Sequence, residues 1–464
     1  PLMESWFTTL CVVDQPSGVA RDPDVVYEFA FVERIEPYRA FIRDTMVWLF
    51  SPLRFFALNC VAVPLPMTFM ELAANCLRLL KALLAPFFCD GGPLAANADE
   101  ARGAPVVGKK NKADPEKVIE AQIIIALTWS CGAVTDKAGR SLFTEFFRKL
   151  LAGTVEMLPE FILFNAKNPE YRAMNTDVGR KMLGKGPGAE GTVYDYCFKA
   201  SGMNWGSWTD GQKKFKIPAK AAFDTIVVPT IDTLRHSWIV EMLLKQHSHV
   251  LVTGGTGTGK TASIKHILAE LSHDAWMPLT LNFSAQTSAN MTQDIIDGKM
   301  GKVRKGIFGP PASKWAAIFV DDLNMPEKEE YGAQPPIEIL RQWMDHMGWY
   351  DLLDKDKQGK SLINLQFLAA MGPPGGGKTR ISQRMVRHFS VIAYCEYTGD
   401  SLGVIFNHIS EWMLSKFPSK LRGAAGALVD ATIQFYHLIQ ENMLPTPAKS
   451  HYTFNLRDLA KVFQ

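Results

Sequence analysis

The sequence has no pair of cysteines spaced C-x-x-C, no apolar run long enough to cross a membrane and no excess of charge of one sign. Its seven cysteines are odd in number and widely spaced, which predicts reduced thiols in a cytosolic compartment and excludes a disulfide framework or a zinc site. The longest uncharged apolar stretch, Phe55 to Met70, contains two prolines and is shorter than the ~20 residues of a spanning helix. The formal net charge is only +3. We therefore expect neither a membrane nor a nucleic acid as a partner.

What the sequence does have is the composition of a globular protein. Hydrophobic residues make up 47% of its 464 residues and charged residues 21%, so the chain can bury several cores. At about 150 residues per domain, the length predicts roughly three domains or subdomains. The chain begins at Pro1 rather than at a methionine and stops at Gln464 inside an amphipathic run, so we expect it to be part of a longer protein.

The pattern of the sequence changes three times along the chain. Residues 1–155 have apolar positions three and four apart, which predicts a helical block, and residues 156–218 mix Gly, Pro and aromatic residues, which predicts a connector with little regular structure. Residues 219–398 alternate short β-branched runs with helical patterns, and 399–464 are helical again. This order predicts an α/β nucleotide-binding domain with a parallel sheet, next to helical subdomains. The expected strands are Ile226–Val228, His249–Thr253, Leu279–Phe283, Ala316–Val320 and Leu365–Met371.

The strongest motif satisfies G-x-x-x-x-G-K-[ST] and lies between an expected strand and an expected helix, Ala262–Leu271. In that context glycine N–H groups wrap phosphates, the helix N-terminus adds its positive end, and Lys260 reaches the β- and γ-phosphates, while Thr261 holds Mg²⁺. The alternative is a glycine-rich turn at the end of a strand. The residues expected around the phosphates are Gly254, Gly255, Thr256, Gly257, Thr258, Gly259, Lys260, Thr261 and Ala262.

A strand that ends in two acidic residues follows further along the chain, at Ala316–Val320 with Asp321 and Asp322. With a P-loop this arrangement is typical of a Walker B segment. Asp321 would bind Mg²⁺ through water, and Asp322 would stand where a carboxylate activates the attacking water. The alternative is an exposed Asp-Asp turn, which the presence of the P-loop disfavours.

A second match to the P-loop pattern, Gly372–Thr379, also follows an expected strand. Two of its residues are prolines, which have no N–H group to offer a phosphate, and no strand with paired acids follows it. We interpret Lys378 and Thr379 as a chance match, in a loop that faces the first site. The alternative is a true second P-loop.

Arginines lie in two places after that loop. Arg384 and Arg387 lie with His388 on an expected helix, and Arg457 lies near the end of the sequence. Sites of phosphoryl transfer use arginines to stabilise the charge on the γ-phosphate, in cis or from a neighbouring subunit. From spacing alone, solvated surface arginines are the simpler interpretation.

Together these motifs make the chain resemble the AAA+ ring of dynein heavy chains. Residues 1–155 are similar to the lid of the second module of that ring, and 219–398 to the large α/β subdomain of the third, after a connector at 156–218; residues 399–464 resemble the start of the third module's lid. The strings that carry the resemblance are Leu127–Ser130, Phe143–Arg148, Val228–Thr233, Asn282–Thr287, Lys305–Pro311, Asp321–Pro326 and Lys449–Leu459.

The resemblance implies roles that the spacing does not supply. Val228 and Pro229 would border the adenine, and Arg457 would be the lid's nucleotide sensor. Arg384 and Arg387 match the helix that carries the family's arginine finger, which points at the nucleotide of the preceding module. The loop at Gly372–Gly377 matches a family loop in which Arg-Asn usually follows, whereas Lys378 and Thr379 follow here. Asp322 occupies a position where fast AAA+ ATPases carry Glu.

The implied function is that of a segment of a minus-end-directed microtubule motor. This module would bind ATP or ADP with Mg²⁺ and gate the ring through slow hydrolysis, while the main hydrolysis belongs to the first module. The implied partners are the other AAA+ modules of the same chain, dynein intermediate and light chains, and microtubules through regions outside this sequence. The implied location is the cytoplasm and cytoskeleton, in particular the ciliary axoneme.

Two other functions remain open from the sequence. The nucleotide could serve as a structural ligand that never turns over. A small-molecule P-loop kinase is the other possibility, and the absence of a compact acceptor lid in the sequence disfavours it.

Overall fold

In a computed structural model, the chain forms two compact units. The first comprises Pro1–Ser207, Val240–Thr253 and Ser272–Ala393, and the second comprises Trp208–Ile239, Gly254–Leu271 and Tyr394–Gln464. Residues 1–30 of the expected first lid, with Cys11, lie outside the described residues. The described residues are 31, 33–101, 103–104, 111–168, 181–199, 202–210, 215–218, 222–223, 226–415, 417–418, 421, 423–446, 449, 452 and 454–464.

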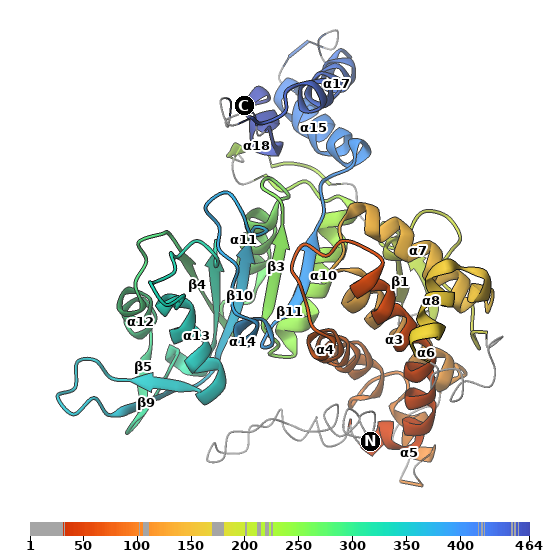
Figure 1. Ribbon diagram of the computed structural model, residues 1–464, viewed down its shortest axis with the longest axis horizontal. Helices are drawn as coiled ribbons and strands as arrows, with labels where there is room; N and C mark the ends of the chain where they lie inside the picture. The colour runs from red at the N-terminus through yellow and green to blue at the C-terminus, as the bar shows by residue number, and fades with distance from the viewer. Residues whose placement is uncertain are drawn as a thin grey trace. The chain divides into compact units, whose positions relative to one another are not determined.

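Helices make up the early part of the first unit, as the apolar spacing predicts (Figure 1). Thr68 begins α4 with a capping box, in which its hydroxyl accepts from the Glu71 N–H and the Glu71 carboxylate accepts from the Thr68 N–H. Aromatic rings join the helices: Phe56 stacks on Phe146, with centroids 4.5 Å apart. The elements are η1 (Glu36–Tyr38), α3 (Arg39–Asn59), α4 (Phe69–Phe88), α5 (Ala95–Ala101), α6 (Pro115–Leu127), η2 (Thr128–Gly132), α7 (Lys137–Leu151) and η3 (Val155–Met157).

The expected connector contains more regular structure than the sequence predicts. Helix α8 (Pro159–Lys167) begins with a proline in its first turn and buries Phe164 against Phe55, with ring centroids 5.5 Å apart. After η4 (Val193–Asp195), strands β1 (Tyr196–Lys199) and β2 (Asn204–Ser207) pair antiparallel. The expectation of little regular structure at 156–218 is therefore wrong for these segments, because aromatic side chains there bury themselves on the helices.

A five-stranded sheet forms the centre of the first unit, in the order β11-β3-β10-β7-β4 (Figure 1). The pairs β3–β10, β10–β7 and β7–β4 are parallel, which confirms the predicted α/β fold. The apolar side chains of β3, β7, β10 and β11 are almost wholly buried, as expected for strands covered on both faces, whereas β4, at the edge of the sheet, is largely accessible. The strands are β3 (Val250–Gly254), β4 (Trp276–Asn282), β7 (Trp315–Asp321), β10 (Leu365–Met371) and β11 (Ser390–Tyr394).

A smaller sheet, in the order β5-β6-β9-β8, and three helices complete this unit. Trp343 of α13 donates from its indole to the Leu362 carbonyl of β9, and Lys360 pairs with Asp297 of α12 at 3.0 Å, so both helices are fixed to the small sheet. These elements are α12 (Ala289–Asp297), β5 (Gly301–Arg304), β6 (Ile307–Gly309), η6 (Pro311–Ser313), α13 (Pro335–His346), β8 (Gly348–Tyr350), β9 (Gly359–Leu362) and α14 (Gln383–Val386).

The outer edge of the five-stranded sheet is covered by the helical region. The Ala393 N–H of β11 donates to the Ala133 carbonyl at 2.8 Å, and the Asn75 side chain of α4 donates to the Val391 carbonyl at 3.2 Å. Arg140 of α7 donates to the Ala393 carbonyl. These bonds join the helices to the sheet within one unit, although the sequence separates them by more than 200 residues.

The second unit has a small core of its own. Leu402, Phe406, Val429 and Leu459 are buried together, and Val228 joins them. The predicted strand Ile226–Val228 is wrong: these residues have no regular structure, because their apolar side chains pack against lid helices instead of entering a sheet. The helices are α10 (Ile231–Lys245), which starts in this unit, α11 (Lys260–Glu270), α15 (Gly399–Leu414), α17 (Ala425–Asn442) and α18 (Leu456–Val462).

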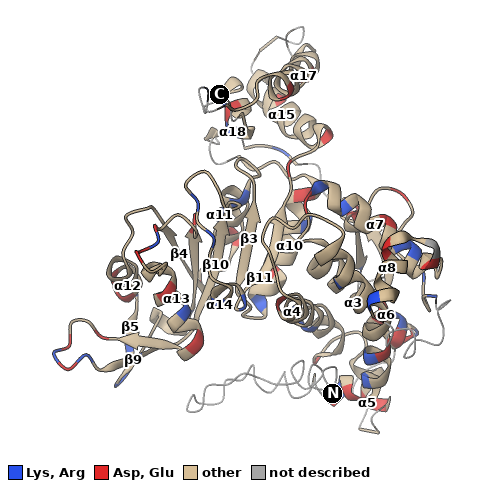
Figure 2. Cartoon of the chain, viewed as in Figure 1, with Lys and Arg blue, Asp and Glu red and all other residues tan. Residues whose placement is uncertain are grey.

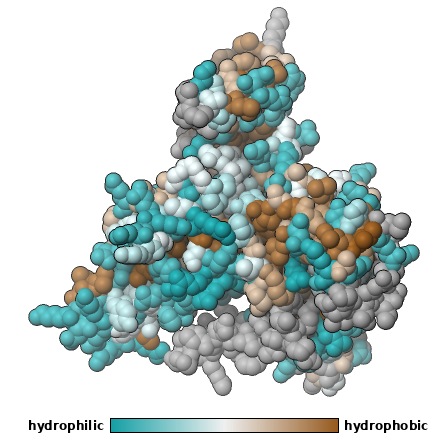
Figure 3. Space-filling view, in the orientation of Figure 1, coloured by the Kyte–Doolittle hydropathy of each residue, from teal (hydrophilic) through white to brown (hydrophobic). Residues whose placement is uncertain are grey.

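Figures 2 and 3 show how charge and hydropathy are distributed over one side of the described residues. Lys and Arg are interspersed with Asp and Glu along the helices α3 to α8 (Figure 2). On the face in view, hydrophobic residues gather over the same helices (Figure 3), where Leu142, Ile162 and Leu163 are exposed. Among the described helices, none has the length and apolar character that crossing a membrane requires.

Candidate nucleotide-binding site

The predicted P-loop follows directly on β3 and leads into α11, as the motif requires. Gly257 and Gly259 have φ angles of 79° and 78°, a left-handed backbone that suits glycine. Gly259 is the N-cap of α11 and gives it no side-chain cap. Since the first turn of any helix has N–H groups without intrahelical partners, the residues Lys260, Thr261 and Ala262 present a helix N-terminus of the kind that binds phosphate.

Lys260 lies folded over its own loop. Its ammonium group donates to the carbonyl oxygens of Gly254 and Gly255, at 2.9 Å and 2.6 Å, and to the Thr258 hydroxyl at 3.4 Å. Thr258 in turn donates to the Gly255 carbonyl at 3.0 Å. The positive charge is thus held beside the turn in which the motif binds phosphates, which fits an anionic ligand.

The lid helix α18 packs against this loop in the second unit. A Cβ atom on Gly257 would lie 2.9 Å from Asn455 Cβ and 3.0 Å from the Leu456 nitrogen, so this position accepts only glycine. Asn455 caps α18 by accepting from the Arg457 N–H at 2.9 Å, and Arg457 is exposed beside it. The structure therefore brings the predicted lid sensor Arg457 close to the P-loop.

Tyr397 closes another side of the loop. A Cβ on Gly259 would lie 2.4 Å from the Tyr397 hydroxyl, and burial raises the pKa of that hydroxyl to about 12, so it stays protonated at neutral pH. Val228 and Pro229, the residues expected near the adenine, belong to the same unit as the P-loop and α18, and Val228 is buried. The second unit therefore contains a cradle that only glycines fit, a lysine and a lid arginine.

The predicted Walker B acids lie in the first unit, at the end of β7. Asp321 is the last residue of this strand, and the parallel pairing of β7, β10 and β3 places the carboxyl ends of the three strands at one edge of the sheet. In open α/β sheets ligands bind at that edge. Asp322 has a φ of 53°, and its N–H donates to Asp321 Oδ1 at 3.1 Å.

The second P-loop match has a different shape. Gly375 and Lys378 exchange backbone hydrogen bonds of 3.0 Å and 3.1 Å in a tight turn, and α14 begins only at Gln383 in this fully described stretch. A P-loop needs a helix that starts at its lysine, and here there is none. Thr379 instead donates its hydroxyl to the Asn324 carbonyl, and Lys378 pairs with Asp322 at 3.0 Å.

The two arginines of the expected finger helix have separate surroundings. α14 is a single turn, shorter than expected, and Arg387 is its C-cap. Arg387 pairs with Asp345 of α13, and the His388 Nε2 lies 3.1 Å from the same carboxylate. Arg384 is exposed, and among the described residues its side chain makes neither a hydrogen bond nor an ion pair. The two arginines therefore have different surroundings, although the spacing places them on one side of the helix.

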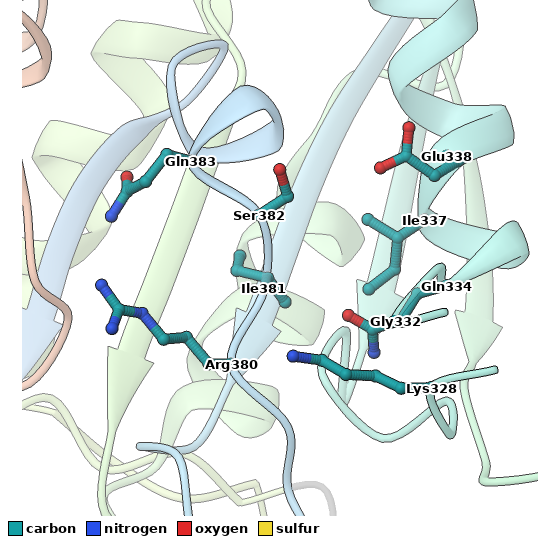
Figure 4. A pocket seen from close by; sticks show the side chains of 9 residues that line it. All are labelled: Lys328, Gly332, Gln334, Ile337, Glu338, Arg380, Ile381, Ser382 and Gln383. Carbon is teal, nitrogen blue, oxygen red and sulfur yellow. The ribbon is translucent and has the colours of Figure 1, made fainter. Parts of the chain in front are cut away.

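A cavity of about 290 Å³ lies beside α14, between α13 and the segment that follows the second loop. Figure 4 shows Arg380 and Lys328 at one end, with Gln334 beside them and Glu338 further along. None of the residues predicted for the nucleotide site lines it. Among the described residues there is also no cluster of three His, Cys, Asp or Glu side chains that would hold a metal ion.

Sequence reasoning missed the contacts that fix α14 to the helical region. Arg78 of α4 donates to the Arg387 carbonyl at 2.6 Å, and the Gln383 side chain donates to the Pro66 carbonyl at 2.9 Å. Arg78 also donates to the Ser390 hydroxyl at 3.4 Å. No local signal in the sequence marks these partners, because they lie about 310 residues apart.

Three family models match the chain. They are a P-loop-containing dynein motor region over residues 215–397, a dynein heavy chain AAA lid domain over 42–210, and an AAA+ lid domain over 428–464. Mouse "Dynein axonemal heavy chain 1" is 36% identical over 97% of this chain and 11% of its own length. Human "Dynein axonemal heavy chain 3" is 36% identical over 100% of this chain and 10% of its own length.

The matches to these two relatives cover nearly the whole of this chain, but the chain spans only about a tenth of the length of these relatives. Rat "Dynein axonemal heavy chain 12" is also 37% identical over 74% of this chain. The two dynein-specific matches, 42–210 and 215–397, coincide with the helical region, the five-stranded sheet and the P-loop described above. From this sheet, this P-loop and these matches, the chain belongs to the dynein heavy chain family.

Proposed function

We propose that the chain forms part of a dynein motor ring and binds ATP or ADP with Mg²⁺ at the P-loop Gly254–Thr261. The observation that carries this proposal is the glycine cradle: Gly257 and Gly259 lie against Asn455 and Tyr397, where a Cβ atom would clash. A loop shaped in this way leaves backbone N–H groups to bind phosphate oxygens.

The proposed division of the chain follows the ring architecture. Residues 1–155 are the lid of the second AAA+ module, 156–218 the connector, 219–398 the large subdomain of the third module and 399–464 the start of its lid. The AAA lid match at 42–210 supports the first of these and runs on into the connector.

Each site residue has a proposed role. Lys260 binds the β- and γ-phosphates, Thr261 and Asp321 bind Mg²⁺, and Asp322 accepts the proton of the attacking water. Arg457 senses the nucleotide from the lid. The bound Mg²⁺ would neutralise charge that develops on the phosphate oxygens.

Two further groups have proposed roles at different sites. Val228 and Pro229 border the adenine at this module's own site. Arg384 and Arg387 belong to a segment that faces the nucleotide of the preceding module and act in trans there.

We propose slow turnover that gates the ring. Asp322 is shorter than the glutamate of fast AAA+ ATPases, and its carboxylate is paired with Lys378. The same pair favours a second candidate function, in which the nucleotide only stabilises the fold and is never hydrolysed.

For the whole heavy chain we propose minus-end-directed movement along microtubules, intermediate and light chains as partners, and a place in the ciliary axoneme; the names of the axonemal relatives support this location.

A Lys260→Ala variant of the full-length heavy chain tests both candidates. Lys265→Ala is the matched control, because Lys265 is exposed on the same helix, away from the loop. We expect Lys260→Ala to lose nucleotide from this module and to change the speed of microtubule gliding, whereas the control changes neither. Loss of nucleotide without a change in speed would favour the structural role, and unchanged nucleotide content would contradict the binding site itself.

A further inference from the structure

We propose that Lys378 restrains hydrolysis at this module by holding the Asp322 carboxylate in an ion pair. The inference rests on the proposed function, because it takes Asp322 as the group that accepts a proton. Hydrolysis joins a water oxygen to the γ-phosphorus, breaks the bond from that phosphorus to the departing ADP oxygen, and passes a water proton to a base. The Asp322 oxygen that accepts a hydrogen bond from the Lys378 ammonium group has fewer free lone pairs with which to accept from the attacking water.

The contact itself is direct. Lys378 Nζ lies 3.0 Å from Asp322 Oδ1, and the side chains are 24% and 50% exposed. Because both side chains are accessible, salt screens the pair and the attraction is weak. The pair can therefore open, and the Asp322 carboxylate is restrained but can still reach the attacking water.

The backbones that carry the two side chains are fixed to each other. The Asn324 side chain donates to the carbonyls of Gly372 and Thr379, at 2.8 Å and 3.2 Å. The Thr379 N–H and hydroxyl both donate back to the Asn324 carbonyl, at 3.0 Å and 3.1 Å. Asn324 is fully buried. The loop after β10 therefore cannot drift away from the segment after β7, and Lys378 stays within reach of Asp322.

Asp322 is held in an uncommon conformation. Its φ of 53° lies in the left-handed region, which costs a residue with a side chain about 1 kcal/mol or more. Strained residues of this kind persist where the surrounding structure determines them, and they cluster at functional sites. The position of this carboxylate is thus imposed by the fold.

Gly372 provides the space for the lysine. A Cβ atom built on Gly372 would lie 2.8 Å from Lys378 Nζ and 2.9 Å from its Cδ. The backbone of Gly372 has no positive φ, so alanine is compatible with it. A Gly372→Ala variant therefore displaces the lysine side chain while both charged residues remain in the protein.

The test uses the full-length heavy chain with the P-loops of its other nucleotide-binding modules disabled. In that background, ATP turnover that Lys260→Ala abolishes belongs to this module. We expect Lys378→Met to raise this turnover about threefold to fivefold, which corresponds to the strength of an exposed ion pair. Gly372→Ala should also raise this turnover. Lys378→Arg keeps a positive charge, so its turnover should stay as low as that of the unmodified chain. Lys355→Met, which removes an exposed lysine from a loop of the same unit, is the matched control and should leave the rate unchanged.

Two readouts separate the ion pair from a merely structural role. Turnover of the unmodified module should rise as salt increases from low to about 0.5 M, because screening weakens the pair, and this rise should be absent in Lys378→Met. In an Asp322→Asn background, Lys378→Met should have no further effect, because the carboxylate it restrains is gone.

The possible failures are distinguishable. If no nucleotide binding depends on Lys260, the proposed function is overturned. If nucleotide binds at Lys260 but Lys378→Met and Gly372→Ala leave turnover unchanged or lower it, the restraint by Lys378 is overturned while the binding site stands. A rise of the same size in Lys355→Met, or in the Asp322→Asn background, would also overturn it.

Discussion

The guanidinium of Arg78 donates a hydrogen bond of 2.6 Å to the backbone carbonyl of Arg387. Arg78 belongs to α4 of the helical region, and Arg387 ends α14 of the α/β region. Burial lowers the pKa of Arg78 to about 10, so it remains charged at neutral pH. A charged donor thus joins the proposed lid of one module to the arginine segment of the next.

We expect Arg78→Met to destabilise the chain by about 1–3 kcal/mol, because it leaves a carbonyl group and the Ser390 hydroxyl without their donor. Denaturant unfolding measures the change. Arg43→Met is the control, since Arg43 lies exposed on α3 and, within the described part of the chain, pairs with its neighbour Asp44 alone. Equal effects of the two substitutions would contradict a structural role for the Arg78 bond.

The arginine segment yields a second prediction. Burial raises the pKa of Asp345, but Arg387 and His388 lower it further, so the net shift is downward and the carboxylate stays paired with Arg387. Since Arg387 is held in this way, we expect Arg384 to face the nucleotide of the preceding module. In a structure of the complete ring with nucleotide, the Arg384 guanidinium should lie within hydrogen-bond reach of that phosphate.

Substitutions check the same assignment. Arg384→Lys should not restore what Arg384→Ala loses, because a lysine lacks the planar fork that binds two phosphate oxygens. Nucleotide release from the preceding module is the measurement. A larger effect from Arg387→Ala, with Arg384→Ala neutral, would reverse the assignment.

For Asp321 we expect a loss of catalysis with partial retention of binding. Asp321→Ala removes a proposed Mg²⁺ ligand, whereas the P-loop N–H groups that we propose to bind the phosphates remain. Removal of one charged group from such a site costs about 2–4 kcal/mol of transition-state stabilisation. Single-turnover hydrolysis and nucleotide binding, measured side by side, test this, and turnover equal to the unmodified protein would rule it out.

A substitution in the glycine cradle, at Gly259, should change both the stability of the protein and its binding of nucleotide. Gly259→Ala should weaken nucleotide binding and cost about 1–2 kcal/mol, because alanine resists a φ of 78° and its methyl group meets the Tyr397 hydroxyl. Tyr397→Phe removes the clash but not the backbone strain. The double variant should therefore recover only part of the loss, and full recovery would show that strain is unimportant.

His249 makes the stability of the first unit depend on pH. Burial, with the charges of Arg78, His388 and His247, lowers its pKa to about 3, and its Nδ1 accepts from the Phe367 N–H at 3.1 Å. The unfolded chain binds a proton near pH 6.5, whereas the folded chain does not until about pH 3. The contribution of His249 to the free energy of unfolding is therefore fully present above pH 6.5. It falls by at most about 1.4 kcal/mol per pH unit as the pH is lowered towards 3.

A His249→Asn variant keeps an acceptor at this position and removes the titration. We expect its free energy of unfolding to change less between pH 6.5 and pH 4 than that of the unmodified chain. An unchanged slope would assign the acid sensitivity to other groups.

The sequence predicts the elements whose signal is local. The strand at Leu365–Met371 has the bounds that were expected, and the P-loop lies between a strand and a helix, because apolar runs and glycine spacing specify both within a few residues. The prediction of a strand at Ile226–Val228 is wrong for a physical reason. An apolar run buried against lid helices has the same composition as one buried in a sheet.

Contacts between distant segments were not predictable in the same way. The prolines of Gly372–Thr379 predict that this loop differs from a P-loop, but the pairing of Lys378 with Asp322 depends on how β10 and β7 lie beside each other in the sheet. The separate surroundings of Arg384 and Arg387 depend on the length of α14, and a four-residue helix leaves almost no periodicity to detect.

The covering of β11 by Ala133, Asn75 and Arg140 bears on how the protein can be divided for expression. A recombinant piece that starts after the helical region would keep the sheet but lose the groups that satisfy its last strand. An uncovered strand edge of this kind pairs with other copies and promotes aggregation. The smallest soluble fragment with a native sheet should therefore begin before α4, so the practical unit of this polypeptide crosses the proposed boundary between successive modules.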